Sequence, residues 1–132
     1  MAMRLHTEDG WSALILEPED CIAAMSGYMQ FLWVQCWEKE TDEDRCAWLA
    51  ERTGEAVPSI AKSFFSQGNN DKALGEVFTE GVLMLQGVAS TRLPVEQRLL
   101  CYADSIAHFN AILIERKYKA ERNPFVSIMA EA

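Results

Sequence analysis

Hydrophobic residues along this 132-residue chain recur mainly at helical spacing. The clearest pattern follows Pro94, where apolar residues recur at intervals of 4, 3, 4, 3 and 4: Val95, Leu99, Tyr102, Ile106, Phe109 and Leu113. This seam is typical of a long helix that packs against a near-antiparallel neighbour. We expect the helix to continue to about Arg122 and to end before Pro124, which leaves residues 125–132 as a C-terminal tail.

A second helical segment begins at Pro18, a residue suited to the first position of a helix, and runs to about Lys39. Its side chains are apolar nearly all round, which is typical of a helix that other elements enclose. Residues 1–16 lack helical spacing and contain Asp9-Gly10, a dipeptide that favours hairpin turns. This segment predicts either a short hairpin or an extended arm.

Helix-end signals divide the middle of the chain. Thr41 followed by Asp44 resembles a capping box and opens a helix that we expect to stop near Gly54. A short helix should then span 59–67, and Asn70 should cap a further helix. The middle of the chain therefore predicts three helices.

These patterns together predict an all-α fold, a compact bundle of four to five helices in a single domain that spans residues 1–132. The first and the last long helices should pack together at its centre. The all-round apolarity of 21–37 needs more cover than the short helices would supply. We therefore also predict a homodimer.

The charge is distributed unevenly along the chain. The whole protein has 20 acidic and 12 basic residues, a net charge of −8. Residues 1–60 hold 12 acids and 4 bases, whereas residues 61–132 hold 8 of each. A one-sided acidic field repels nucleic acid and anionic membranes and attracts basic partners.

The acids are densest between the first two predicted helices. They form the run Glu38, Glu40, Asp42, Glu43 and Asp44. Clustered carboxylates speed up encounters with a cationic partner, although such a run can also be a solvated loop that caps a helix. Three nearby aromatic residues are candidate anchors for a partner: Trp33, Trp37 and Trp48. Tryptophan is enriched in binding hot spots, and the alternative is that these rings fill the core.

Reactive side chains are not grouped in a catalytic or metal-binding pattern. The four cysteines and two histidines have no zinc-site spacing, and His108 lacks a second imidazole nearby in the sequence. We predict no catalytic residue, no metal and no cofactor.

The N-terminus has no basic segment followed by an apolar run, and 21–37 falls short of the ~20 apolar residues that span a bilayer. The sequence therefore predicts a cytoplasmic protein that does not bind membranes.

Residues 47–65 contain a spaced pattern of small and branched residues, with Ala50, Gly54 and Ile60 at its packing positions. This stretch resembles the helix-turn-helix of phage-repressor-like DNA-binding proteins. The resemblance implies a transcriptional regulator. The region is acidic, however, and DNA affinity depends largely on Lys and Arg.

The charge pattern favours a different function over DNA binding. We expect a small acidic protein-interaction module, such as an inhibitor, an immunity protein or a phage-type antagonist. Its partner would be a basic protein or a nucleic-acid-binding protein, and it would not bind nucleic acid directly. The helix-turn-helix regulator is the alternative.

Overall fold

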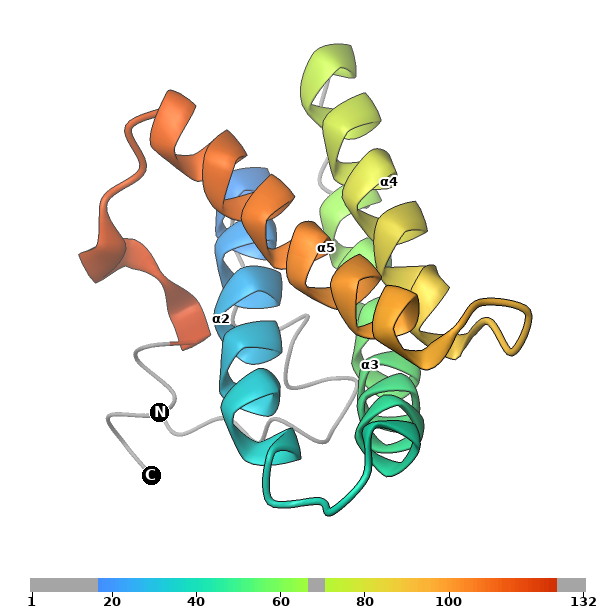
Figure 1. Ribbon diagram of the computed structural model, residues 1–132. Coiled ribbons are helices and arrows are strands. Elements are labelled where there is room, and N and C mark those ends of the chain that lie inside the picture. The colour runs from blue at the N-terminus through green and yellow to red at the C-terminus, as the bar shows by residue number, and fades with distance from the viewer. Residues whose placement is uncertain (1–16, 67–70, 126–132) are drawn as a thin grey trace.

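The computed structural model describes residues 17–66 and 71–125, and these ranges contain α-helices and short 3-10 helices but no strand. The α-helices are α2 (Pro18–Cys36), α3 (Asp42–Phe65), α4 (Lys72–Gln86) and α5 (Val95–Glu115). The 3-10 helices are η1 (Gly87–Ala89) and η2 (Ala120–Arg122). The predicted all-α bundle is confirmed (Figure 1). The predicted arm or hairpin (1–16), the predicted cap at residue 70 and most of the predicted tail lie outside the described residues.

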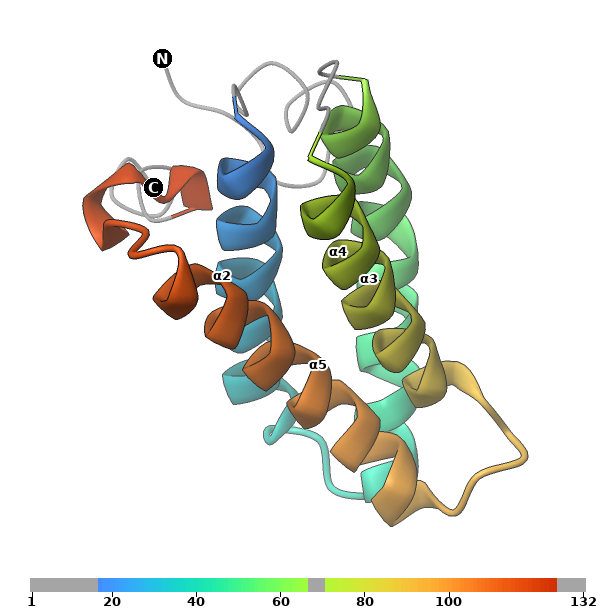
Figure 2. The ribbon, with the colours of Figure 1, turned by 90° about the horizontal axis from the view of Figure 1, so that it is seen from above.

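The four long helices form a bundle in which each helix runs antiparallel to the next. Figure 1 shows α2, α3 and α4 side by side, with α5 crossing diagonally in front of them, and Figure 2 shows the same crossing from above. α5 packs against α2, α3 and α4, and α3 packs against α2 and α4. The core lies where α5 crosses the other three helices.

The apolar seam of α5 faces this core, as predicted. Leu99, Tyr102 and Phe109 are buried, and the other seam residues are partly buried against the core. The Tyr102 hydroxyl donates a hydrogen bond to the Met29 carbonyl of α2 over 2.7 Å, deep inside the molecule. α2 and α5 therefore pack together at the centre of the bundle, as the sequence predicted.

Two glycines let α5 approach α4 and η1 closely. A Cβ atom at Gly81 would lie 2.4 Å from Cε1 of Phe109, and one at Gly87 would lie 2.4 Å from Sγ of Cys101. The Ser105 hydroxyl also donates to the Gly81 carbonyl over 2.7 Å. These glycines lower the helix propensity of this region, but they are needed for the close contact between the helices.

The predicted helix end at Gly54 is wrong, because α3 continues without a break to Phe65 and includes Pro58. Gly54 does not adopt the left-handed φ that a helix-ending glycine uses. Pro58 has no N–H to donate, so it removes one helical hydrogen bond. Ala56 and Ile60 are nevertheless buried on either side of it, and their packing holds the helix together. The turn implied by the resemblance to helix-turn-helix proteins is therefore not present in residues 47–65.

The predicted continuation of the last helix to Arg122 is also wrong, because α5 ends at Glu115. Lys117 has φ of 56°, the left-handed conformation that glycine usually supplies at helix ends. The Lys117 N–H donates to the Ile114 carbonyl over 3.0 Å, and the Tyr118 N–H donates to the Leu113 carbonyl over 2.9 Å. This is the Schellman pattern of hydrogen bonds, and it turns the chain back toward α2.

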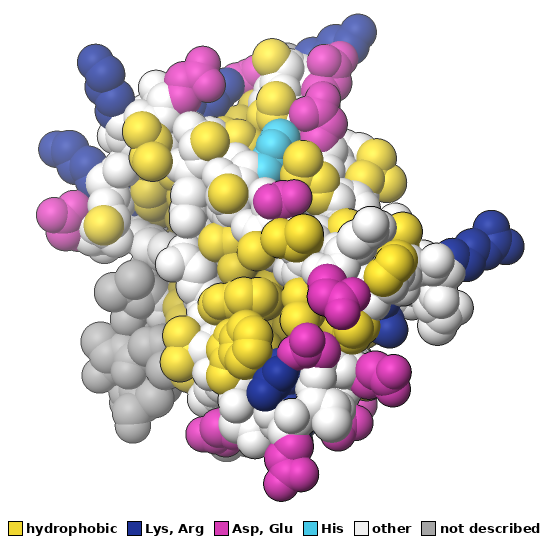
Figure 3. All heavy atoms as spheres, viewed as in Figure 1, with side chains coloured by type: hydrophobic (Ala, Val, Ile, Leu, Met, Phe, Trp, Pro, Cys, Tyr) yellow, Lys and Arg dark blue, Asp and Glu magenta, His cyan; other side chains and the backbone are white. Residues whose placement is uncertain are grey.

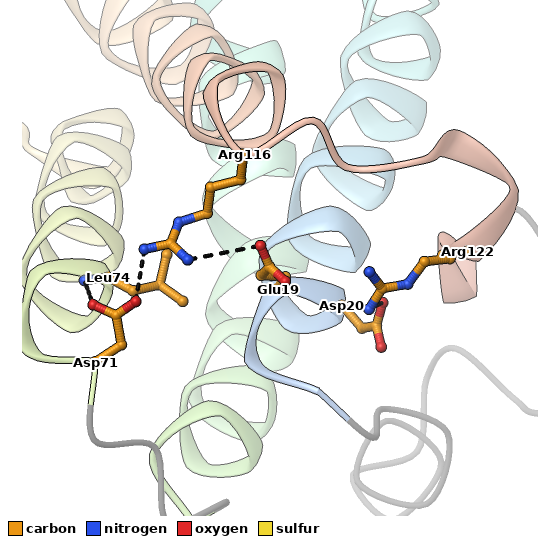
Figure 4. Close-up of polar contacts among 6 residues, drawn as sticks. All are labelled: Glu19, Asp20, Asp71, Leu74, Arg116 and Arg122. Carbon is orange, nitrogen blue, oxygen red and sulfur yellow. Dashed lines mark hydrogen bonds and ion pairs between the residues drawn. The ribbon is translucent and has the colours of Figure 1, made fainter.

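Residues 116–125, which we call the returning segment, pack along the first half of α2. The Tyr118 hydroxyl donates to the carboxylate of Asp20. Arg122 lies 3.3 Å from the same carboxylate, and Figure 4 shows these two residues facing each other. The ring of Phe125 is buried against Gly27, where a Cβ atom would come within 3.0 Å of it. The first residue of the predicted tail is thus part of the core.

Candidate interaction surface

The predicted acidic run lies where α2 ends and α3 begins. Thr41 is the N-cap of α3, and its hydroxyl accepts a hydrogen bond from the Asp44 backbone N–H over 3.1 Å. The predicted cap at Thr41 is confirmed. The acids of the first turn of α3 also lie at the positive end of its helix dipole, where negative side chains stabilise a helix. We call residues 37–45 the acidic corner.

Most carboxylates of the acidic corner face solvent without a cationic partner. Glu38, Glu40, Glu43 and Asp44 are exposed, and none of them forms an ion pair with another described residue. Asp42 differs, because its carboxylate pairs with the Arg45 guanidinium three positions later. With the exposed Lys39 counted against these four carboxylates, the corner has a net charge of about −3.

The tryptophan at this corner is half exposed. Trp37 has an exposed fraction of 47%, and the guanidinium of Arg45 lies 4.4 Å from the centre of its ring. Trp33 packs edge-to-face against Trp37 at 5.5 Å and stacks on Tyr102 at 5.7 Å. The aromatic contacts thus lead from an open surface at Trp37 to the buried centre of the bundle.

The other predicted anchors are more enclosed. Trp33 and Trp48 are partly buried and pack against the hydrophobic core. Arg52 lies 5.1 Å and Lys39 lies 6.0 Å from the Trp48 ring. Trp33 and Trp48 therefore contribute mainly to packing, whereas Trp37 offers exposed area for a partner beside the free carboxylates.

A second polar cluster, at the other end of α2, joins three helix ends (Figure 4). Arg116, after α5, lies 2.7 Å from Asp71 and 3.7 Å from Glu19. Asp71 is the N-cap of α4 and accepts a hydrogen bond from the Leu74 N–H over 3.0 Å. The Leu74 N–H and the Arg116 guanidinium hold the pKa of Asp71 below its ordinary value of 3.8. The cluster ties α2, α4 and α5 together, and no local sequence pattern indicates it, because its members lie far apart along the chain.

The thiols of the core are held in their protonated forms. Burial raises the pKa of Cys21 to about 12 and also raises the pKa values of Cys36 and Cys46. A thiol must lose its proton to act as a nucleophile, so these three are inert near neutral pH.

Nε2 of His108 lies 2.7 Å from the Val77 carbonyl, so this imidazole contacts the backbone of α4. Within 17–66 and 71–125, no three His, Cys, Asp or Glu residues are grouped to hold a metal ion.

Comparison with protein families, with curated proteins and with solved structures gives no match for this chain. In the part of the chain that the structure describes, no helix has the length and apolarity to cross a bilayer.

Proposed function

We propose that this protein is a small acidic interaction module that binds and occludes a basic surface of another macromolecule. An inhibitor, an immunity protein or a phage-type antagonist acts in this way. One observation carries the proposal: within residues 37–45, four exposed carboxylates that form no ion pair with another described residue accompany a half-exposed tryptophan, Trp37. The proposed partner is a basic protein, such as a nucleic-acid-binding protein.

The two parts of this corner would contribute differently to binding. Exposed charges act chiefly on the rate of encounter, because they attract the opposite charge over a Debye length of about 8–10 Å. Trp37 would supply apolar area, and a buried tryptophan at an interface is often a hot spot. Arg45 holds the Trp37 ring from one side and neutralises Asp42 alone, so the remaining field stays negative.

The regulator hypothesis has less support than the interaction module. Its implied turn would lie between Gly54 and Pro58, and both residues are inside the continuous α3. The uncompensated charge at the start of the same helix would repel phosphate groups. We therefore propose that the protein does not bind nucleic acid directly.

Three further proposals concern enzymatic activity, cellular location and oligomeric state. We propose that the protein is not an enzyme, that it acts in the cytoplasm and that it forms a homodimer. Less of the apolar surface of α2 is left for a dimer contact than the sequence indicated, because eleven of the nineteen α2 residues are already buried within one chain. The large apolar side chain that α2 still exposes is Val34, and Trp37 at the C-cap of the helix is exposed beside it. Sedimentation at tens of micromolar should show the dimer, and a monomer alone would remove it.

The test of the acidic corner uses an oligo-arginine peptide as a cationic probe and a short DNA duplex as an anionic one. The variant carries Glu38→Gln, Glu40→Gln and Glu43→Gln, and leaves the paired Asp42 intact. We expect the variant to fold normally and to bind oligo-arginine about tenfold more weakly at low salt, since each exposed charge contributes up to ~1 kcal/mol. Neither protein should bind the duplex.

A matched control variant carries Glu55→Gln, Glu76→Gln and Glu121→Gln. These three residues are exposed, so the control loses the same net charge from other faces. Its affinity for oligo-arginine should change by about twofold at most. Equal losses in the two variants would show that binding follows net charge rather than the corner, and DNA binding would contradict the proposal directly.

A further inference from the structure

The outer face of α5, opposite the core, exposes an apolar stripe. Leu100, Ala107 and Ile114 lie at intervals of seven residues, which places them on one side of the helix. Leu100 has an exposed fraction of 58% and Ile114 one of 77%, and Ala107 and Ala111 between them are also exposed. At 1.5 Å per residue the stripe is about 21 Å long. Figure 3 looks onto this face and shows hydrophobic side chains across its middle, with acidic side chains among them.

The carboxylates of α5 that lie beside this stripe are exposed, and the nearest bases beyond the end of the helix are Arg116 and Lys117. Glu96, Asp104 and Glu115 are exposed and form no ion pair with another described residue. Asp104 and Glu115 are eleven residues apart, about three helical turns, so they lie along the same edge of the stripe. The one Lys or Arg within α5 is Arg98, which donates to the Val88 carbonyl over 2.9 Å and so points toward η1. This face is acidic although residues 61–132 are neutral overall.

We infer that the outer face of α5 is a second binding surface and that its ligand is a cationic amphipathic helix. Such a helix repeats apolar residues every three or four positions, which matches a stripe of this length, and carries Lys or Arg beside them. Its bases would meet Asp104 and Glu115. A second copy of this chain fits less well, because it would bring another set of carboxylates to the same edge. The inference does not depend on the acidic corner.

The test uses a synthetic helical peptide of leucine, alanine and lysine with its leucines on one face. A scrambled peptide of the same composition, in which the leucines are spread around the helix, serves as its control. Titration calorimetry should show that the patterned peptide binds at least about tenfold more tightly than the scrambled one, since only it can bury a continuous apolar face.

Two protein variants locate the contact. Ile114→Ser should weaken binding of the patterned peptide about tenfold, because the exposed Ile114 would be buried by the ligand. Leu83→Ser on α4 is the matched control, with an exposed fraction of 59%, and should change affinity by about twofold at most. Asp104→Asn combined with Glu115→Gln should weaken binding at low salt, and this loss should shrink as salt rises.

Several outcomes would overturn the inference. Equal binding of the patterned and scrambled peptides would do so, as would an Ile114→Ser protein that binds like the parent. If Ile114→Ser converts a dimer into a monomer in sedimentation, a second copy covers this face instead. NMR shifts confined to residues 37–45 would move the peptide to the acidic corner. The variant lacking Glu38, Glu40 and Glu43 should bind the patterned peptide within about twofold of the parent, so failure of the corner proposal is separable from failure of this one.

Discussion

Gly54→Ala tests whether α3 is one continuous helix or the helix-turn-helix that the sequence resembles. In the structure Gly54 is an exposed residue inside α3, and a Cβ atom added there would have no neighbour within 4 Å. In a helix-turn-helix the same glycine would end a helix in the left-handed conformation. The two structures therefore predict effects of opposite sign on the free energy of unfolding.

The magnitude follows from backbone entropy and helix propensity. Alanine in an exposed helix interior is favoured over glycine by up to ~1 kcal/mol, and Gly→Ala changes without strain stabilise proteins by about 0.4–1 kcal/mol. We expect Gly54→Ala to stabilise the protein by about 0.5–1 kcal/mol, which raises Tm by roughly 2–4 °C for a chain of this length. A left-handed Gly54 would instead make alanine cost roughly 1–2 kcal/mol.

Gly81→Ala is the matched control, since Gly81 is also inside a helix but its Cβ atom would lie 2.4 Å from Phe109. It gains the same propensity yet forces the Phe109 ring to move, and overpacking of this kind costs about 1–3 kcal/mol. Urea unfolding followed by circular dichroism measures both variants. A Gly54→Ala protein that is less stable than the parent would refute the continuous α3.

Two further predictions concern the core and the cluster of helix ends. Phe109→Ala removes a fully buried ring that packs on Phe78, so it should lower the free energy of unfolding by about 3–5 kcal/mol in the same urea assay; a near-normal Tm would contradict this packing. Asp71→Asn keeps a capping acceptor but loses the charge that pairs with Arg116. Because the folded-state pKa of Asp71 is lowered, its charge stabilises the protein above the ordinary pKa of 3.8 and stops doing so as pH falls through the folded-state pKa. The gap in urea midpoint between parent and Asp71→Asn should therefore be largest near neutral pH and close in acid, and a gap independent of pH would contradict the ion pair.

The elements that the sequence predicted well depend on local signals. The seam of α5 and the Thr41 cap both follow from residues within a few turns of one another, and both are present. The end of α5 had no such signal, because Lys117 occupies the left-handed position where glycine is usual. The predicted break between Gly54 and the short helix at 59–67 is wrong for the opposite reason: Pro58 favours the start of a helix, but the burial of Ala56 and Ile60 on either side of it keeps α3 continuous.

The candidate surfaces show the same division between local and distant information. The acidic corner is a contiguous run, so the sequence located it, but the pairing of Asp42 with Arg45 and the enclosure of Trp48 required the fold. The acidic character of the α5 outer face was hidden, because counting charges over residues 61–132 does not show that Arg98 turns toward η1. Which charges share a face depends on helix rotation in the bundle.

The returning segment ties the order of synthesis to the order of folding. Gly27 of α2 is synthesised early, whereas Phe125, whose ring packs against it, is synthesised after the four long helices. The early half of α2 therefore leaves the ribosome without its final cover, and the nascent chain displays an apolar surface until the last helix has turned back at Lys117. Because residues 116–125 complete the packing of α2 only after α5 has been made, a ribosome that stalls within α5 would hold an open and aggregation-prone intermediate.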